Sequence, residues 1–227
     1  MDEPIASGRD SEIFPLSPGV VVKRARAGRS LGYEANAMEL ARAFSVPTPR
    51  VHEVRDEGRE IVMDRVDGPT LAQWAAQRPW RLRSAARILA DMGDAVHRVP
   101  APSWLRDAGD GGVVLVHLDL HPLNVLMGAS GPVLIDFANA ARGTAATDDA
   151  LTWVLLATGN DEPRGLLYDA ALRFGRGAFL RSYLAARDRA ALRRALPHAA
   201  ALKQHDANFT DAERRAIAAL VARECSA

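Results

Sequence analysis

One segment of about two dozen residues places polar, reactive side chains between strongly apolar runs. It reads VHLDLHPLNVLM at residues 116–127 and continues to LIDFAN at residues 134–139. Polar groups that enter a buried strand cost free energy unless they find partners. The segment is therefore either a solvated loop or a functional site. In both cases we expect Asp119, Asn124 and Asp136 to lie next to the ends of apolar strands.

The oxygen-bearing side chains of this segment suit two different tasks. Mg²⁺ prefers oxygen ligands and takes only one or two from protein carboxylates and amides when nucleotide phosphates complete its shell. Asn124 and Asp136 offer such a pair. Asp119 would then be free to accept the proton of an attacking hydroxyl, as a catalytic-loop aspartate does in phosphoryl transfer.

The first part of the chain, up to about residue 65, is predicted to be strand-rich. The β-branched run at 19–26 predicts a strand that carries Lys23, and the spacing from Tyr33 to Phe44 predicts a helix over 32–44 that the prolines of VPTP end. RVHEV and EIVM flank the turn-forming DEGR and predict a hairpin.

The remainder is predicted to be mainly helical. Helices are expected from near Thr70, over LRSAARILADMGDAVHRV, and from about Asp148 onward, with Thr210 and Glu213 forming a capping box for the last one. A small hairpin made of LMG and PVLIDF is set among them. We expect an N-terminal unit at 1–66 and a C-terminal unit at 67–227, which meet at the VDGPT loop.

Charge and cysteine content exclude several classes of function. Lys and Arg number 29 against 28 Asp and Glu, so no excess charge favours nucleic acid or an anionic membrane. The single cysteine, Cys225, rules out an intramolecular disulfide and a cysteine-based metal cluster. The acidic start MDEPIASGRDSE does not suit a secretory signal, so we expect a soluble, cytoplasmic protein without nucleic-acid or membrane partners.

The motif H117-L-D-L-H-P-L-N124 resembles the H-G-D-L-H-P-x-N signature of the aminoglycoside phosphotransferase and choline kinase group, and I135-D-F follows at the expected distance. The resemblance implies a bilobal, protein-kinase-like α+β fold with a small strand-rich N-lobe and a mainly helical C-lobe. It also implies transfer of the γ-phosphoryl group of ATP, with Mg²⁺, to a hydroxyl of a small molecule. Asp119 would be catalytic, and Asn124 and Asp136 would hold the metal.

The same resemblance assigns the nucleotide site to the N-terminal unit. Lys23 would contact the phosphates and Glu34 would orient it, with Glu39 as an alternative partner. The stretch at 7–14 lies where a loop would cover the phosphates, and it offers Gly8 and Ser11 in place of a glycine-rich motif. An ordinary turn is the alternative there.

Two further groups of residues are expected around the nucleotide and the acceptor. Backbone groups at Met63, Asp64 and Val66, which connect the lobes, would bind the adenine. His117 is expected to hold the loop from inside, and His121 either orders that loop or touches substrate. Asp149 would bind backbone amides of the loop, and Asp206 and Asn208 are candidates for the wall of the acceptor cleft.

Three alternatives stay open at this point. Leu118, where the signature has glycine, and the glycine-poor loop would also suit a nucleotide-binding pseudokinase with a regulatory role. A protein kinase would need H-R-D and A-P-E segments, which the sequence lacks. A zinc site at the two motif histidines and Asp119 has no fourth ligand at a suggestive spacing.

The acceptor is not defined by the sequence. Residues 137–227 carry more Arg and Lys than Asp and Glu, which argues against a polycationic aminoglycoside as the native acceptor. We expect a monomer that acts on a small-molecule alcohol, with an oligomer left open.

Overall fold

A computed structural model describes residues 3–8, 10–26, 30–158, 166–204 and 210–225, and the side chains of 166–174 are not among the described features. The N-terminal part forms a five-stranded antiparallel sheet in the order β1-β2-β3-β5-β4. Its strands are β1 (Ala6–Ser7), β2 (Ser11–Ser17), β3 (Val20–Ala25), β4 (Val51–Arg55) and β5 (Glu60–Asp64). The predicted strand at 19–26 and the predicted hairpin are therefore confirmed.

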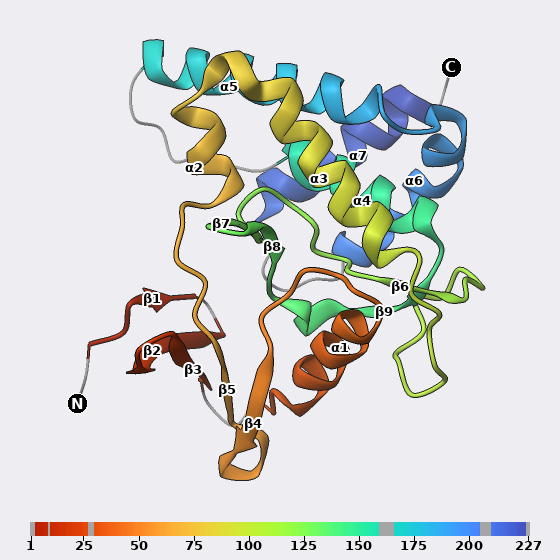
Figure 1. Cartoon of the computed structure of the whole chain (residues 1–227). Coiled ribbons are helices and arrows are strands. Elements are labelled where there is room, and N and C mark those ends of the chain that lie inside the picture. Colours follow the sequence, from red (N-terminus) through yellow and green to blue (C-terminus); the bar gives the residue numbers. More distant parts are fainter. Residues whose placement is uncertain (1–2, 9, 27–29, 159–165, 205–209, 226–227) are drawn as a thin grey trace.

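Helix α1 (Gly32–Ala43) connects β3 to β4 and lies beside the sheet (Figure 1). Its buried stripe is made of Ala37, Met38 and Ala41, together with Glu34. The sequence predicted a helix over 32–44, and the helix ends one residue earlier, at Ala43. Phe44 is the C-cap residue and is 51% exposed, because it lies just past the last helical residue and outside the buried stripe.

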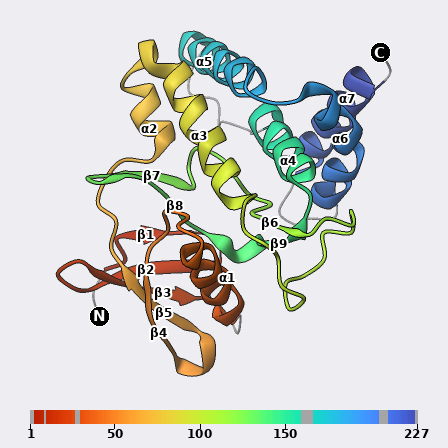
Figure 2. The same ribbon diagram turned by 45° about the vertical axis from the view of Figure 1, so that its right-hand side comes forward.

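Helices dominate the C-terminal part and lie at the opposite end of the molecule from the sheet (Figures 1 and 2). They are α2 (Leu71–Ala76), α3 (Leu82–Val96), α4 (Ala145–Thr158), α5 (Leu166–Leu184), α6 (Arg189–Gln204) and α7 (Asp211–Cys225). The capping box that was expected at Thr210 is present, since Thr210 and Glu213 bond each other's backbone amides. The main core lies among these helices, with Leu89, Trp153 and Tyr183 buried in it.

Two short antiparallel strand pairs lie between the sheet and the helices. The expected hairpin is confirmed as β7 (Val125–Gly128) with β8 (Gly131–Leu134). The second pair, β6 (Val114–Val116) with β9 (Ala141–Gly143), was not predicted. The polar motif of residues 117–124 runs from the end of β6 to the start of β7. It is therefore held by a strand at each end.

The connection from β5 to α2 is tied to the β7–β8 hairpin. The amide of Met127 donates to Pro69 O at 2.8 Å, and the amide of Ala72 donates to Pro122 O at 3.1 Å. A Cβ added at Gly68 would lie 2.1 Å from Met127 O, so this close approach of two backbones requires glycine. The placement of a lobe boundary near residue 66 stays a prediction.

Among the described residues, no helix combines the length and the apolar character needed to cross a membrane.

Candidate active site

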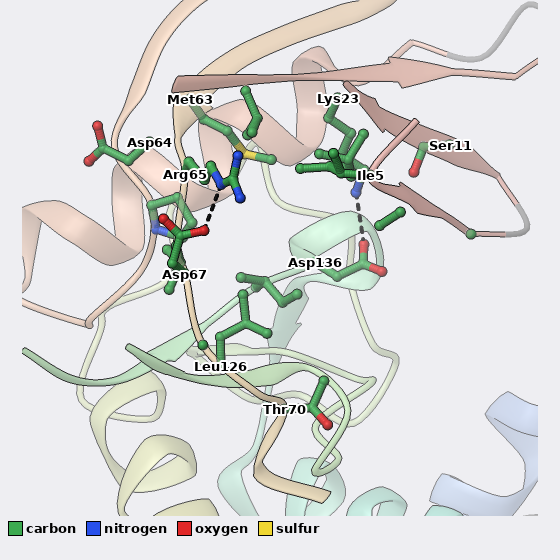
Figure 3. A pocket seen from close by; sticks show the side chains of 18 of the residues that line it. Ile5, Ser11, Lys23, Met63, Asp64, Arg65, Asp67, Thr70, Leu126 and Asp136 are labelled. Atoms are coloured by element: carbon green, nitrogen blue, oxygen red, sulfur yellow. Dashed lines mark hydrogen bonds and ion pairs between the residues drawn. The ribbon is translucent and has the colours of Figure 1, made fainter. Parts of the chain in front are cut away.

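Lys23 is bound by two carboxylates at the centre of the site. It lies on β3 between β2 and β5, and its Nζ is 2.6 Å and 2.9 Å from the two carboxylate oxygens of Glu34 on α1. The same Nζ is 3.2 Å from Asp136 Oδ1 (Figure 3). Burial alone would lower the pKa of Lys23, but the charges of Glu34 and Asp136 outweigh it and raise that pKa.

These contacts draw a cation of the sheet, an acid of α1 and an acid that follows β8 into one cluster. Glu34, not Glu39, is the partner of Lys23 among the described contacts. Glu34 lies 11 residues after Lys23 in the sequence, and Asp136 lies 113 residues after it. The N-terminal sheet and the C-terminal part are thus joined through charged groups.

A cavity of about 500 Å³ opens beside this cluster (Figure 3). Its lining includes every residue that the sequence assigned to the nucleotide: Gly8, Ser11, Lys23, Glu34, Met63, Asp64 and Val66, together with Asp136. Apolar side chains from both parts of the chain, Ile5, Val21, Leu126 and Ile135 among them, form much of the rest. A largely apolar cavity with a few charged groups in its lining is typical of a small-molecule site.

The expected phosphate-covering loop is shorter than the sequence suggested. Residues 11–14 belong to strand β2, and β1 ends at Ser7. The amide of Gly8 donates to Ser11 O at 2.9 Å. Gly8 and Ser11 both line the cavity.

The motif at 117–124 is shaped by an unusual backbone conformation at Leu118. Its φ is +55°, in the left-handed region that costs a non-glycine residue about 1–2 kcal/mol. The amide of Leu118 donates to Asp148 Oδ1 at 2.7 Å, and the amide of His117 donates to Asp148 Oδ2 at 3.0 Å. This positive φ explains why the signature has glycine at the position of Leu118. In this chain, the hydrogen bond to Asp148 stabilises the same conformation for leucine.

The expectation that Asp149 would bind the loop amides is wrong by one residue. Asp148 has this role, and it lies in the first turn of α4, which begins at Ala145 and not near residue 148. One residue turns a side chain by about 100° around a helix, so Asp149 faces other partners. It accepts from Tyr183 Oη at 2.7 Å and pairs with Arg187 Nε at 3.0 Å.

Beneath the loop, His97 at the end of α3 completes the partners of Asp148. Its Nε2 lies 2.9 Å from Asp148 Oδ2. Burial would lower the pKa of His97, but the hydrogen bond and charge of Asp148 outweigh it, so that pKa is raised. Burial would raise the pKa of Asp148, but His97 and the loop amide of His117 hold it below its ordinary value.

His117 lies inside the loop, fully buried, and its Nε2 donates to Ile135 O at 3.1 Å. Its ring also packs edge-on against Phe137, with the ring centroids 4.8 Å apart. The next residue after Ile135 is Asp136, whose φ is +65°. His117 therefore holds the segment that aims the Asp136 carboxylate.

Asp119 projects from the loop into a group of cationic and amide side chains. Its Oδ1 is 3.3 Å from Lys203 Nζ, and its Oδ2 is 3.6 Å from His121 Nε2. The side chain is 22% exposed. Burial would raise the pKa of Asp119, but His121 and Lys203 outweigh it and hold that pKa below its ordinary value.

Asn124 and Asp136 offer the oxygen donors that a hard cation needs. The Asn124 side-chain amide donates to Asp119 O at 2.9 Å, which leaves its carbonyl oxygen as an acceptor. The backbone amide of Ile135, the residue before Asp136, donates to the backbone carbonyl of Asn124 at 2.9 Å. This bond ties the backbone beside Asp136 to that of Asn124. Asp136 is 43% exposed at its side chain and carries the negative charge. These donors fit Mg²⁺.

Within the described residues there is no cluster of three or more His, Cys, Asp and Glu placed to hold a metal ion. A metal at this site would thus need ligands from a bound nucleotide or water besides Asn124 and Asp136.

Tyr33 joins α1 to the C-terminal part, and sequence reasoning took it only as a core residue. Its Oη donates to Ala140 O at 2.7 Å and accepts from the Arg106 amide at 3.1 Å. The Arg106 guanidinium lies 4.1 Å from the ring centroid, and Trp104 packs against the ring edge. Since Tyr33 precedes Glu34, it fixes the end of α1 that carries the partner of Lys23.

Asp206 and Asn208, which were expected near the acceptor, lie outside the described residues. Lys203 and Asp148 were missed as well. Lys203 had no motif around it. Asp148 could not be distinguished from Asp149 without knowing where α4 begins and therefore which way each side chain points.

Comparisons with known proteins give a match to one family model and a likeness in fold to solved structures. Residues 101–198 match the sequence model of a family described as a phosphotransferase enzyme family. None of the curated proteins matches the chain significantly. The matched stretch contains Asp119, Asn124, Asp136 and Asp148 but neither Lys23 nor Lys203.

Solved structures resemble the whole chain. The aminoglycoside phosphotransferase APH(4)-Ia is 17% identical with a TM-score of 0.61, over 98% of this chain and 93% of its own. A choline/ethanolamine kinase family protein from Mesorhizobium loti is 12% identical with a TM-score of 0.60, over 99% and 86%. The streptomycin–ATP complex of APH(2'')-IIa is 18% identical with a TM-score of 0.57, over 88% and 82%.

The resemblance inferred from the motif is thus confirmed, and the protein-kinase-like α+β fold with it.

Proposed function

We propose that this protein is an ATP- and Mg²⁺-dependent phosphotransferase that moves the γ-phosphoryl group to a hydroxyl of a small molecule. The observation that carries the proposal is the convergence of Lys23, Glu34 and Asp136 on one cavity, next to the loop that presents Asp119 and Asn124. The match to a phosphotransferase family supports the type of reaction.

The nucleotide would lie in the cavity with its phosphates toward Lys23. Glu34 fixes the ammonium of Lys23, which can then bind phosphate oxygens as a point charge. Residues Met63 to Val66 line the same cavity, and their backbone groups would bind the adenine. Solved structures of similar fold include complexes with ATP and with ADP, which supports a nucleotide in this place.

Asn124 and Asp136 would hold Mg²⁺ by their side-chain oxygens. When bound, the ion supplies neutralisation of the negative charge that builds up on the phosphate oxygens. Because Lys23 contacts Asp136 directly, the two groups are positioned to act on the same phosphates. His117 keeps Asp136 in place through its bond to Ile135.

Asp119 would orient the acceptor hydroxyl and take its proton. The hydroxyl oxygen attacks the γ-phosphorus, the bond from that phosphorus to the β,γ-bridging oxygen breaks, and ADP leaves with the negative charge. The hydroxyl proton passes to the Asp119 carboxylate. This requires ionised Asp119, which its neighbours His121 and Lys203 favour.

The alternative of a pseudokinase rested on Leu118 and the glycine-poor phosphate loop. Leu118 adopts the conformation that glycine would adopt, and the bond to Asp148 stabilises it there. Gly8 and Ser11, from the glycine-poor segment, both line the cavity. Both departures are thus accommodated, which favours the enzyme.

The test is the variant Asp119→Asn. We expect it to lower ATP turnover by about 10²–10⁴-fold, the usual contribution of a general base, while the affinity for Mg·ADP stays within twofold. Asp91→Asn is the matched control, because Asp91 lies exposed on α3 and pairs with Arg87 on the same helix. Turnover is measured as ADP formed with a panel of aminoglycosides, macrolides, sugars and amino alcohols. Wild-type turnover in Asp119→Asn would show that the role is wrong.

A further inference from the structure

The chain holds 29 Lys and Arg residues, and only two of them are lysines, Lys23 and Lys203. Both lysines are buried, and each contacts a carboxylate of the candidate active site. Arginine presents a planar fork, whereas lysine presents a compact ammonium that acts as a point charge. In a chain that otherwise uses arginine for positive charge, lysine at these two places indicates a need for a compact ammonium.

Lys203 reaches the site from a direction different from that of Lys23. It lies in the last turn of α6, which packs against α4, and its side chain is 8% exposed. Among the residues that line the nucleotide cavity, Lys23 is present and Lys203 is not. Lys203 also lies beyond the stretch that matches the family model. It therefore contacts Asp119 from outside the lining of the nucleotide cavity.

The surroundings of Asp119 show why a cation there has chemical use. His121 and Asn124 are near one carboxylate oxygen, and Lys203 is near the other. An oxygen anion that approaches Asp119 meets the repulsion of its carboxylate. A fixed ammonium within 3.3 Å of that carboxylate offsets the repulsion and can itself bind the anion.

We propose that Lys203 is an anion-binding residue on the acceptor side of Asp119. The proposal rests on the proposed function, and it deepens it. The anion is an oxygen of the phosphoryl group in transfer or of an acidic substituent on the acceptor. In either case, an ammonium group of the acceptor beside its reacting hydroxyl would be repelled by the positive charge of Lys203. The site therefore favours neutral or acidic alcohols over amino alcohols.

The experiment compares Lys203→Met, which removes the charge, with Lys203→Arg, which keeps it in another shape. Arg193→Met on the same helix is the matched control, because its side chain is 48% exposed and pairs with Glu224 away from the site. The first probe is the affinity for Mg·ADP with and without tetrafluoroaluminate, a planar mimic of the phosphoryl group. The second is ATP-dependent phosphorylation of glucuronate, glucose and glucosamine.

If Lys203 binds the phosphoryl group, Lys203→Met keeps its affinity for Mg·ADP but loses about 10²-fold in affinity for the fluoroaluminate complex. If it binds an acidic acceptor, the fluoroaluminate complex is unaffected, while KM rises at least tenfold for glucuronate and not for glucosamine. We expect Lys203→Arg to recover only part of either effect. Both patterns support the anion-binding role, and they distinguish the source of the anion.

Wild-type behaviour of Lys203→Met with both probes would overturn this inference and leave the proposed function intact. So would an equal loss in Arg193→Met, since the effect would then belong to α6 as a whole. A wild-type protein that binds no Mg·ADP would instead overturn the proposed function, and this inference with it.

Discussion

The loop that carries Asp119 should depend on Asp148 more than on any other side chain of α4. The Asp148 carboxylate is fully buried and accepts from three donors: the Leu118 amide at 2.7 Å, the His117 amide at 3.0 Å and His97 Nε2 at 2.9 Å. In Asp148→Asn, one oxygen becomes an NH₂ group that faces donors instead of accepting from them. At least one buried backbone amide then loses its partner.

The magnitude follows from these contacts. A buried donor left without a partner costs about 1–3 kcal/mol, and removing one member of a buried charged pair costs about 3–5 kcal/mol. The left-handed conformation of Leu118 also loses the bond that offsets its cost. We expect the free energy of unfolding to fall by about 3–5 kcal/mol, whereas a surface change such as Asp91→Asn should stay within about 0.5 kcal/mol.

Two measurements check this prediction. Urea unfolding at pH 7 gives the change in stability, with Asp91→Asn as the control. Amide hydrogen exchange reports on the loop itself, and the Leu118 amide should exchange much faster in Asp148→Asn than in the wild type. A stability loss below about 1 kcal/mol together with unchanged exchange at Leu118 would refute the idea that Asp148 holds the loop.

Three other changes give separate tests. The folded-state pKa of His97 is raised above its ordinary 6.5, so its pairing with Asp148 contributes stability fully below pH 6.5 and loses it as pH rises through that raised value. The gap in unfolding free energy between the wild type and His97→Phe should accordingly shrink between pH 6 and 9, and a constant gap would contradict the assignment. Gly68→Ala should lower the melting temperature by several degrees, because the new Cβ would lie 2.1 Å from Met127 O, and an unchanged melting temperature would show that the two backbones can separate. Tyr33→Phe should lower kcat about tenfold, the equivalent of roughly 1.4 kcal/mol, with little change in overall stability, and unchanged kcat would mean that Glu34 does not need this anchor.

Local signals in the sequence were sufficient to predict part of the candidate site. The meeting of Lys23, Glu34 and Asp136 could be predicted because a strand, a helix and a motif each carry a strong local signal, whereas the metal-binding role of Asn124 stays a prediction. The structure brings Lys23, Glu34 and Asp136 into direct contact. The fold class followed from the same signals, since hydrophobic periodicity separates a strand-rich part from a helical one.

What could not be predicted depends on tertiary contacts or on the phase of one helix. Asp148 and Asp149 are neighbours of the same residue type, and only the start of α4 at Ala145 decides which of them faces the loop. Lys203 meets Asp119 across 84 residues without any motif of its own. Strands β6 and β9 are three residues each, too short for a periodic signal.

The most direct test of the central claim is phosphorus NMR of Mg·ATP incubated with the protein and the acceptor panel. The proposed function predicts that the γ-phosphate signal of ATP is replaced by the signals of ADP and of a phosphate monoester with at least one acceptor. Asp119→Asn should give neither product signal over the same time. No consumption of ATP with any acceptor, or equal product formation by the wild type and Asp119→Asn, would contradict the account.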